Sequence, residues 1–341
     1  PLSIACGNTV VLKASSQTPL TAMRIMELFY TEGGFPKGVV NLVTCSRVEA
    51  DILLTDERVK AVTFVGTTGV GKQVYSKAAE HGKRVQAQTE AKNHALVLED
   101  CNLEATVNAI INSTYGCAGM RCMALPVVCV QESIADDFVA LLKKKAEAMK
   151  LGCAYEEATD LGPVVNAGHK AKICDWIQKG IDEGAELVLD GRDVKVPGYE
   201  NGFFVGPTIL DHVKPGMTVG DREIFGPVTC IKRVKDYEEG IKIMNANPFA
   251  NGSCIFTQSG YYSRRFAMDI DGGMVGINVG IPVPTAYFPF SGNKDSFFGD
   301  LHVLGRDGYR FFTRAKTVTT HWFDENAGSR KVGTWEGSTE A

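Results

Sequence analysis

Strand-like and helix-like segments alternate through the first ninety residues, and this alternation limits the possible folds more than any other feature of the sequence. The pattern predicts strands at residues 8–13, 39–44, 60–66 and 84–88, with helices at 18–34, 49–55 and 69–80 between them. Strands about twenty residues apart with helices between them indicate βαβ units on a parallel sheet. Ligands of such sheets bind at the carboxyl ends of the strands, so the loops near residues 13, 44 and 66 are the first candidate binding sites.

The glycine-rich loop after the third of these strands is a candidate anion site. Gly66 to Lys72 matches the pattern GxxxxGK, but the next residue, Gln73, has no hydroxyl for a magnesium ion, which argues against an ATPase. A glycine turn that leads into a helix still suits a phosphate, because free N–H groups and the helix dipole favour an anion. An ordinary strand-to-helix turn explains the same residues.

A second α/β block follows. The pattern predicts a strand at 127–131 and a helix at 133–150, for which Ser133 and Asp136 form a candidate capping box. Further helices are expected at 103–117, 170–184 and 236–245, and further strands near residue 187 and at 253–257 and 274–278. The alternating run 314–322 reads as a half-exposed strand, and 324–341 as a flexible tail.

Composition removes several classes of function. The 36 Lys and Arg residues against 40 Asp and Glu residues give a net charge of -4, which argues against nucleic acid as the partner. The longest uncharged stretch, 272–293, is interrupted by prolines and glycines, which argues against a membrane span, and the first residues do not read as a signal peptide. The ten cysteines and six histidines show no zinc-site spacing, so no metal is expected and the thiols should be free in a reducing compartment.

One cysteine has the surroundings of a nucleophile. In the run Gly116 to Cys122 (GCAGMRC) a cysteine lies at a glycine-rich junction, with Arg121 next to it to favour the thiolate. A buried packing cysteine is the alternative, because such cysteines are the more common kind.

An ordered series of motifs resembles the aldehyde dehydrogenase superfamily. The series is FVGT (64–67), Gly71, GMRC (119–122), EIFGP (223–227) and PFSG (289–292). Within the superfamily the sequence is most similar to the CoA-acylating methylmalonate-semialdehyde dehydrogenase branch, on RVQA (84–87), AKNH (91–94), RCMAL (121–125), GYENG (198–202) and IPVP (281–284). The resemblance runs from residue 1 to about 323.

The resemblance implies a site and a reaction. Cys122 would attack an aldehyde carbon, and NAD would accept the hydride, which leaves a thioester on the enzyme. Lys13, Gly66, Thr67, Gly71, Glu223 and Phe225 would bind the coenzyme. Arg121 and Phe290 would bind a semialdehyde acid, with the guanidinium clamping its carboxylate, which then leaves as CO₂. Taken alone, Glu223 also reads as an ordinary capping or salt-bridging carboxylate, and Arg121 as a surface arginine.

The acyl acceptor is expected to be coenzyme A. Most of the family has a glutamate base 34 residues before the cysteine, and this chain has Gln88 there. An amide cannot activate water, whereas the thiol of CoA is already partly ionised near neutral pH. Glu90, two residues further along, is the alternative base, and it would support hydrolytic oxidation instead.

Departures from the family pattern modify these expectations. Ser16 replaces a glutamate that usually holds the adenine ribose, so NADP should be tolerated beside NAD. Met120 stands where the family often has glutamine, and Glu90 where close backbone packing commonly calls for glycine. An N-terminal portion of the family fold, with an oxyanion-hole asparagine, has no counterpart in the chain.

The expected organisation is therefore an aldehyde dehydrogenase-like α/β fold. It has an incomplete, parallel-sheet coenzyme domain (1–90), an α/β catalytic domain (91–295) and a return segment with an oligomerisation strand (296–323). A homodimer or homotetramer is expected, in the mitochondrial matrix of a eukaryote or the cytoplasm of a bacterium, with a role in valine, pyrimidine or inositol catabolism. A catalytically weakened paralogue with a structural or binding role is the alternative of a different class.

Overall fold

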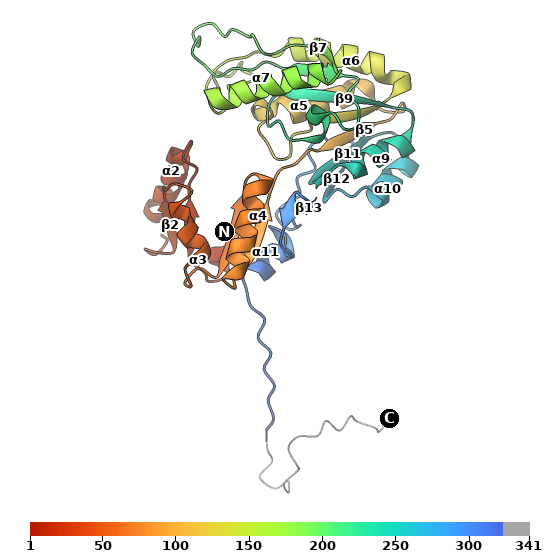
Figure 1. Cartoon of the computed structure of the whole chain (residues 1–341). Helices are drawn as coiled ribbons and strands as arrows, with labels where there is room; N and C mark the ends of the chain where they lie inside the picture. Colours follow the sequence, from red (N-terminus) through yellow and green to blue (C-terminus); the bar gives the residue numbers. More distant parts are fainter. Residues whose placement is uncertain (323–341) are drawn as a thin grey trace, which may run out of the picture.

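The structure, a computed structural model, describes residues 1–322 and divides them into two lobes (Figure 1). The first lobe contains the elements from α1 to β4 together with β14 and α11 near the end of the chain. The second lobe contains the elements from β5 to β13. The predicted flexible tail, 324–341, lies outside the described residues.

The first lobe carries the βαβ pattern. Its elements are α1 (Leu2–Ala5), β1 (Val10–Lys13), α2 (Pro19–Thr31), β2 (Val40–Val43), η1 (Glu49–Asp51), α3 (Ile52–Thr55), β3 (Ala61–Val65), α4 (Thr68–Glu80), β4 (Arg84–Gln88), β14 (Phe297–Phe298) and α11 (Gly305–Phe311). β1 pairs with β2 and β3 with β4, both in parallel, whereas β14 adds to β4 antiparallel. The first lobe thus contains two small sheets, where the sequence suggested one parallel sheet.

The second lobe is built on a seven-stranded sheet with the order β12-β11-β5-β6-β9-β8-β7. Its elements are β5 (His94–Val97), α5 (Leu103–Tyr115), η2 (Gly116–Gly119), β6 (Val127–Gln131), α6 (Glu132–Glu147), α7 (Ala167–Asp182), β7 (Glu186–Leu189), β8 (Thr208–Asp211), α8 (Thr218–Asp221), β9 (Val228–Val234), α9 (Tyr237–Ala246), β10 (Phe249–Ala250), β11 (Gly252–Phe256), α10 (Gly260–Asp269), β12 (Met274–Ile277) and β13 (Asn293–Lys294). All neighbours in this sheet are parallel except β7 and β8.

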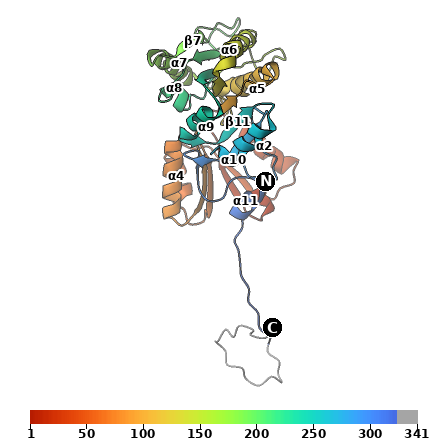
Figure 2. The same cartoon turned by 90° about the vertical axis from the view of Figure 1, so that its right-hand side faces the viewer.

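The strands of this sheet are apolar because helices cover both of its faces (Figure 2). One large core contains residues of α5, α6 and α7, including Ile110, Phe138 and Ile177, all fully buried. A second core under α9 and α10 contains Tyr237 and Phe266. This lobe therefore provides the rigid base on which a catalytic loop can be held.

One sequence prediction of local structure is wrong, and another stays a prediction. Helix α6 starts at Glu132 with Gln131 as its N-cap, and the hydroxyl of Ser133 donates to Glu99, so Ser133 forms no capping box. The run 314–322 forms no strand within the described residues, and it extends away from the body of the molecule (Figure 1). Because the expected strand would pair with another subunit, the oligomerisation strand stays a prediction.

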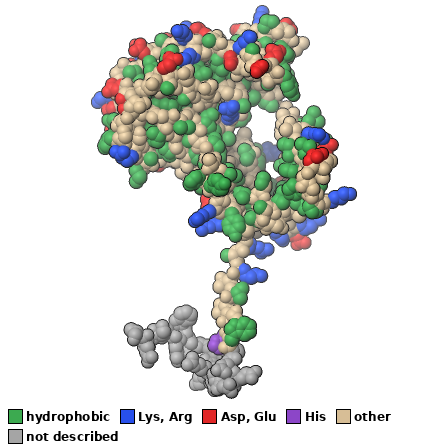
Figure 3. Space-filling model, turned by 180° about the vertical axis from the view of Figure 1, so that it is seen from behind, with side chains coloured by type: hydrophobic (Ala, Val, Ile, Leu, Met, Phe, Trp, Pro, Cys, Tyr) green, Lys and Arg blue, Asp and Glu red, His purple; other side chains and the backbone are tan. Residues whose placement is uncertain are grey.

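The outer part of the first lobe exposes apolar side chains. Helix α2 has no buried residue, and Leu20 is 75% exposed. On the neighbouring strand β1, Val11 is 47% exposed. Figure 3 shows an open space between this arm and the second lobe. An exposed apolar face of this kind is normally covered by protein.

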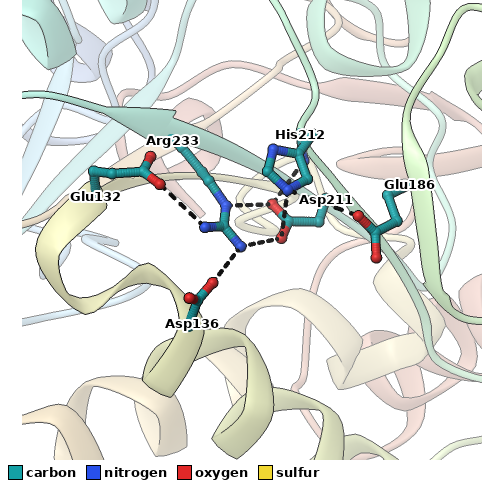
Figure 4. Close-up of polar contacts among 6 residues, drawn as sticks. All are labelled: Glu132, Asp136, Glu186, Asp211, His212 and Arg233. Atoms are coloured by element: carbon teal, nitrogen blue, oxygen red, sulfur yellow. Dashed lines mark hydrogen bonds and ion pairs between the residues drawn. The ribbon is translucent and has the colours of Figure 1, made fainter.

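A network of charged residues ties helix α6 to the sheet (Figure 4). The guanidinium of Arg233, on β9, contacts the carboxylates of Asp211 and Asp136 at 2.8 Å each and that of Glu132 at 3.2 Å. Asp211 is only 2% exposed, so it needs the paired charge. This cluster therefore connects α6 with β8 and β9.

Within residues 1–322 no group of side chains is arranged to hold a metal ion.

No helix of the described residues has the length and apolar character needed to cross a bilayer.

Candidate active site

A short segment between β4 and β5 connects the two lobes and contacts most parts of the candidate site. Gln88 ends β4 in the first lobe, and His94 begins β5 in the second. Between them, Glu90 contacts α4, the N–H of Ala91 donates to Glu223, and Asn93 contacts the Cys122 loop. The candidate site is therefore assembled around this crossing.

The loop that carries the candidate nucleophile begins with a left-handed turn. Cys117, Ala118 and Gly119 have φ angles of 53°, 53° and 68° in succession, although non-glycine residues seldom adopt such values. A Cβ on Gly119 would lie less than 3.0 Å from the carbonyl oxygen of Gly226. The strained turn is thus fixed by backbone contact with the EIFGP motif, which brings two motifs far apart in sequence together.

The environment of the Cys122 thiol raises its pKa. Partial burial is the main cause, and the nearby negative charge of Glu223 adds to it. The backbone N–H groups of Cys122 and Met123 act in the opposite direction, because they stabilise the thiolate. Cys122 is half-buried, whereas Cys117 is exposed. Because only the thiolate is the nucleophile, a raised pKa leaves a smaller fraction of Cys122 in the reactive form at neutral pH.

Two asparagines that the sequence did not identify as site residues hold the main chain of the nucleophile. The Nδ2 atoms of Asn93 and Asn251 donate to the carbonyl oxygen of Cys122, at 2.9 and 3.1 Å. Asn93 belongs to the AKNH motif, so its position beside the site had a signal in the sequence. Asn251 had none, because only the folded chain brings the start of β11 to the cysteine loop.

Glu223 is a buried carboxylate with a raised pKa of about 7. Burial is the main cause, and the charge of Glu90 adds to it, while the Ala91 N–H at 3.1 Å from Oε1 favours the ionised form. Near neutral pH this carboxyl group exists in both protonation states. Its proximity to Cys122 places a titrating group beside the candidate nucleophile.

Phe225 precedes Gly226, whose carbonyl group packs against Gly119 of the same loop. Its φ angle is 60° and its side chain is 38% exposed, which is unusual for a large apolar residue in a left-handed conformation. His169, on α7, fixes this residue: its Nε2 lies 2.7 Å from the Phe225 carbonyl oxygen, and the two rings meet edge to face. His169 is a further residue that the sequence did not identify.

The candidate coenzyme residues of the first lobe lie at the carboxyl ends of β1 and β3. Lys13 ends β1, and its Nζ donates to the carbonyl oxygen of Ala14 at 3.0 Å. Gly66 follows β3, and Thr67 is the N-cap of α4. Gly71 is buried, and a Cβ there would collide with the side chain of Thr89. Gly71 therefore allows close packing of α4 on the segment after β4.

Glu90 occupies the N-terminus of α4. Its Oε2 accepts the backbone N–H of Thr68 at 2.9 Å. A carboxylate is favourable there, because the first N–H groups of a helix lack partners and the helix dipole is positive at that end. This is also the end that the sequence identified as a candidate phosphate site.

Several polar atoms between the lobes are buried without a hydrogen bond among the described residues. They are Gln86 Oε1, Gln88 Nε2, Lys92 Nζ and His94 Nε2. Burial lowers the pKa of both Lys92 and His94, and it places that of His94 well below its ordinary range. A buried polar atom without a hydrogen bond lowers the stability of the fold. Four such atoms close together in the sequence therefore indicate that these residues serve a purpose other than stability.

Arg121 and Phe290 lie in different surroundings. Arg121 is exposed and its guanidinium packs over the main chain at Gly116; among the described residues no ion pair is recorded for it. Phe290 is half-buried and its backbone N–H donates to Val303 at 2.7 Å. Within residues 1–322 no hydrogen bond or ion pair joins either side chain to Cys122, so their substrate-binding roles stay predictions.

Two pockets on the surface of the second lobe are lined by residues outside the candidate site. The larger, of about 650 Å³, lies beside Lys232, Arg233 and helix α9, and the smaller, of about 300 Å³, beside Lys145 and Met149. Neither includes Cys122. The chemistry of the residues, and not the size of a cavity, identifies the candidate site.

Comparisons with known proteins agree with this geometry. The model of the aldehyde dehydrogenase family matches residues 1–318. A malonate-semialdehyde dehydrogenase of Bacillus cytotoxicus is 48% identical over 323 residues, which cover 95% of this chain and 66% of the relative.

Two solved structures have the same fold. The methylmalonate-semialdehyde dehydrogenase of Oceanimonas doudoroffii is 43% identical, with a TM-score of 0.92 over 94% of this chain and 66% of that one. An aldehyde dehydrogenase of Mycobacterium tuberculosis, complexed with NAD⁺, is 31% identical, with a TM-score of 0.86 over 92% of this chain and 64% of that one.

The chain thus spans 66% of the length of the first of these relatives, and the match includes both lobes. A match of this extent establishes the fold and the family predicted from the ordered motifs. The chain belongs to the aldehyde dehydrogenase family.

Proposed function

We propose that this chain carries the nucleophile and the coenzyme-binding residues of an NAD-dependent, CoA-acylating oxidation of malonate or methylmalonate semialdehyde. The names of its relatives support the substrate class. The single observation that supports CoA as the acceptor is the amide of Gln88, which ends β4 where a hydrolytic enzyme of this family needs a carboxylate base.

The residues present fit a nicotinamide dinucleotide in most respects. Lys13 lies at the carboxyl end of β1 and Thr67 follows the carboxyl end of β3, while Glu223 and Phe225 belong to the second lobe. When bound, the nicotinamide ring accepts a hydride from the aldehyde carbon. Lys13 and Glu223 would hold the ribose hydroxyls, and Phe225 the ring. The carboxylate of Glu90 is the one group that opposes a phosphate.

In the first half-reaction the Cys122 thiolate attacks the aldehyde carbon. A new C–S bond forms, and the oxygen of the aldehyde takes up negative charge. The N–H groups of Cys122 and Met123 favour the thiolate form, because they lower the pKa of the Cys122 thiol. Loss of hydride from the carbon then leaves a thioester on Cys122. The Cys122 thiol loses its proton before the attack. Ionised Glu223 is a nearby group that can accept this proton and pass it to solvent.

In the second half-reaction the carboxylate of the acyl group leaves as CO₂, and one proton is taken up at the carbon that remains. Arg121 would hold this carboxylate before it leaves. Thiolate of CoA then attacks the thioester carbon and displaces Cys122, because Gln88 cannot remove a proton from water. The products are the shorter acyl-CoA, CO₂ and reduced coenzyme.

Production of NADH by the purified chain with malonate semialdehyde, with and without CoA, tests this proposal. We expect a burst of about one NADH per site without CoA and steady turnover with it. Gln88→Glu should raise the rate without CoA, since a carboxylate then stands where water is activated. Steady formation of the free acid without CoA, lost in Glu90→Gln, would overturn the thiolysis proposal in favour of Glu90 as base.

A second candidate function is that of a catalytically weakened paralogue with a structural or binding role. Two observations favour it: Glu90 occupies the N-terminus of α4, and the outer face of α2 and β1 is exposed. Absence of both the burst and measurable NAD binding would support this candidate.

Assembly into a homodimer or homotetramer is also a proposal. The run 314–322 belongs to no sheet of the described chain, and its Val318 and Trp322 are 75% and 88% exposed. An exposed segment with alternating residues can add a strand to a sheet of another subunit. Light scattering at micromolar concentration tests it, and a monomer would overturn it.

A further inference from the structure

The peptide that links Cys122 to Met123 is held at its carbonyl oxygen. Its carbonyl oxygen accepts hydrogen bonds from the amides of Asn93 and Asn251, at 2.9 and 3.1 Å, which occupy both lone pairs of that oxygen. In a planar trans peptide the N–H points opposite to the C=O. Fixing the oxygen of Cys122 therefore fixes the direction of the Met123 N–H.

That N–H acts on the nucleophile. Together with the N–H of Cys122 it lowers the pKa of the Cys122 thiol, against the larger effect of burial and the charge of Glu223. These two N–H groups are therefore the part of the surroundings that favours the reactive thiolate. A rotation of the 122–123 peptide would remove one of them and aim a carbonyl dipole at the sulfur.

Both asparagines are themselves immobilised. Asn93 is 4% exposed; its Oδ1 accepts the N–H of Gly252 at 2.8 Å, and its Nδ2 also donates to the Ala124 carbonyl at 2.7 Å. Asn251 is 6% exposed, and its Nδ2 also lies 3.2 Å from the sulfur of Met123. The acceptors around each Nδ2 determine which end of the amide carries the donors. Only a side-chain amide provides this set in the space available.

We propose that Asn93 and Asn251 are positioning residues for the nucleophile, which hold the 122–123 peptide so that the Met123 N–H faces the Cys122 sulfur. The proposal rests on the proposed role of Cys122 as the nucleophile. The two residues that orient this peptide therefore come from outside the cysteine loop: Asn93 from the segment between the lobes, and Asn251 from the residue before β11. Neither asparagine needs to contact substrate or coenzyme.

The rate of alkylation of Cys122 by iodoacetamide, measured against pH, tests the proposal without substrate or coenzyme. Trypsin cleaves after Arg121, so Cys117 and Cys122 fall on different peptides and mass spectrometry follows each separately. Wild type is compared with Asn251→Ala and with Asn251→Asp, which keeps the volume of the side chain but turns a donor toward a carbonyl into an acceptor. Asn93→Asp tests the second contact.

A matched control is Asn245→Ala. Asn245 is half-buried and also holds main chain, by donating to Asp269 at 2.7 Å and accepting from Asp271 at 2.9 Å, but it does not contact the cysteine loop. It should lose stability by a similar amount and keep the wild-type alkylation profile. Thermal unfolding of each variant confirms that the alkylated protein is folded.

We expect the Asn251 variants to shift the titration of Cys122 upward by about half a pH unit to one unit, so that alkylation near pH 8 slows about three- to tenfold. Asn251→Asp should have the larger effect. A wild-type profile in folded Asn251→Ala and Asn251→Asp would overturn the positioning role. If the profile shifts but wild type gives no NADH burst, the positioning role stands and the proposed function fails.

Discussion

The carboxylate of Glu90 accepts the backbone N–H of Thr68 at 2.9 Å, at the first turn of helix α4. Glu90 lies in the crossing between the lobes, and its side chain reaches back to the first lobe. The same helix end is where the family resemblance places a pyrophosphate. One internal carboxylate therefore satisfies a helix terminus that a dinucleotide would otherwise use.

Replacing Glu90 with glutamine should strengthen NAD binding. The amide keeps an oxygen that can accept the Thr68 N–H, but it removes a negative charge from the site of two phosphates. We expect an increase in affinity of about two- to fivefold by calorimetry, which corresponds to one charge near a helix end. Glu49→Gln is the control, because Glu49 also accepts a main-chain N–H in this lobe, from Ser46 at 2.7 Å. Equal or weaker binding in Glu90→Gln would contradict the competition.

Cys122 should be the essential thiol. Cys122→Ala should abolish NADH formation, whereas Cys117→Ala should retain it, because Cys117 is exposed and lies outside the held peptide. Both variants should unfold near the wild-type temperature. Cys117 already has a left-handed φ angle, so alanine adds no new backbone strain there. Activity in Cys122→Ala and its loss in Cys117→Ala would reverse the assignment.

Glu223→Gln should lower the pKa of the Cys122 thiol. Burial of the thiol is unchanged in this variant, but the negative charge that opposes the thiolate is gone. The alkylation profile of Cys122 should therefore move to lower pH, opposite to the shift expected for Asn251→Asp. Glu200→Gln is the control, since Glu200 is an exposed carboxylate that accepts the Gly198 N–H. A profile that does not move would show that Glu223 has no electrostatic effect on the thiol.

Glu223 should also make stability depend on pH. Its pKa rises from 4.5 to about 7 in the folded chain, so the folded state binds the proton more tightly than the unfolded state. The stabilisation from protonated Glu223 is fully present below pH 4.5 and is lost as pH rises through 7. We expect the melting temperature of wild type, relative to Glu223→Gln, to fall between pH 5 and 7.5 and then level off. A difference that is constant with pH would contradict the raised pKa.

Gly119→Ala should be strongly destabilising, because a Cβ there would collide with the backbone of Gly226. Gly82→Ala is the control that measures the backbone strain without this collision. Gly82 has the same φ angle of 68°, but a Cβ there would meet nothing within 4 Å. Gly82→Ala should therefore cost only the backbone strain, about 1–2 kcal/mol. Gly119→Ala adds the collision with the Gly226 carbonyl, a further ~1–3 kcal/mol. Urea unfolding measures both, and equal losses would show that the two loops can separate.

The sequence was informative where the signal is local or where motifs recur in a fixed order. The βαβ pattern predicted β1 to β4 and the helices between them, because each element has apolar residues that recur with its own period in the sequence. The ordered motifs identified the family, which the match over residues 1–318 confirms. The capping box at Ser133 failed because the hydroxyl is used by Glu99, a partner 34 residues away that local pattern does not show.

The sequence alone thus determined the family, and it provides the predictions that Cys122 is the nucleophile and that Gln88 stands in place of a base, since these depend on residue identity and order. Only the tertiary structure decided how the site is held. Asn251 contacts Cys122 although 129 residues separate them in the chain. Glu90, which lies two residues beyond the end of β4, contacts Thr68 at the start of α4. The physical reason is that the strength of a hydrogen bond depends on distance and direction in space, and these are set by the packing of β11, α4 and the crossing segment after the chain has folded.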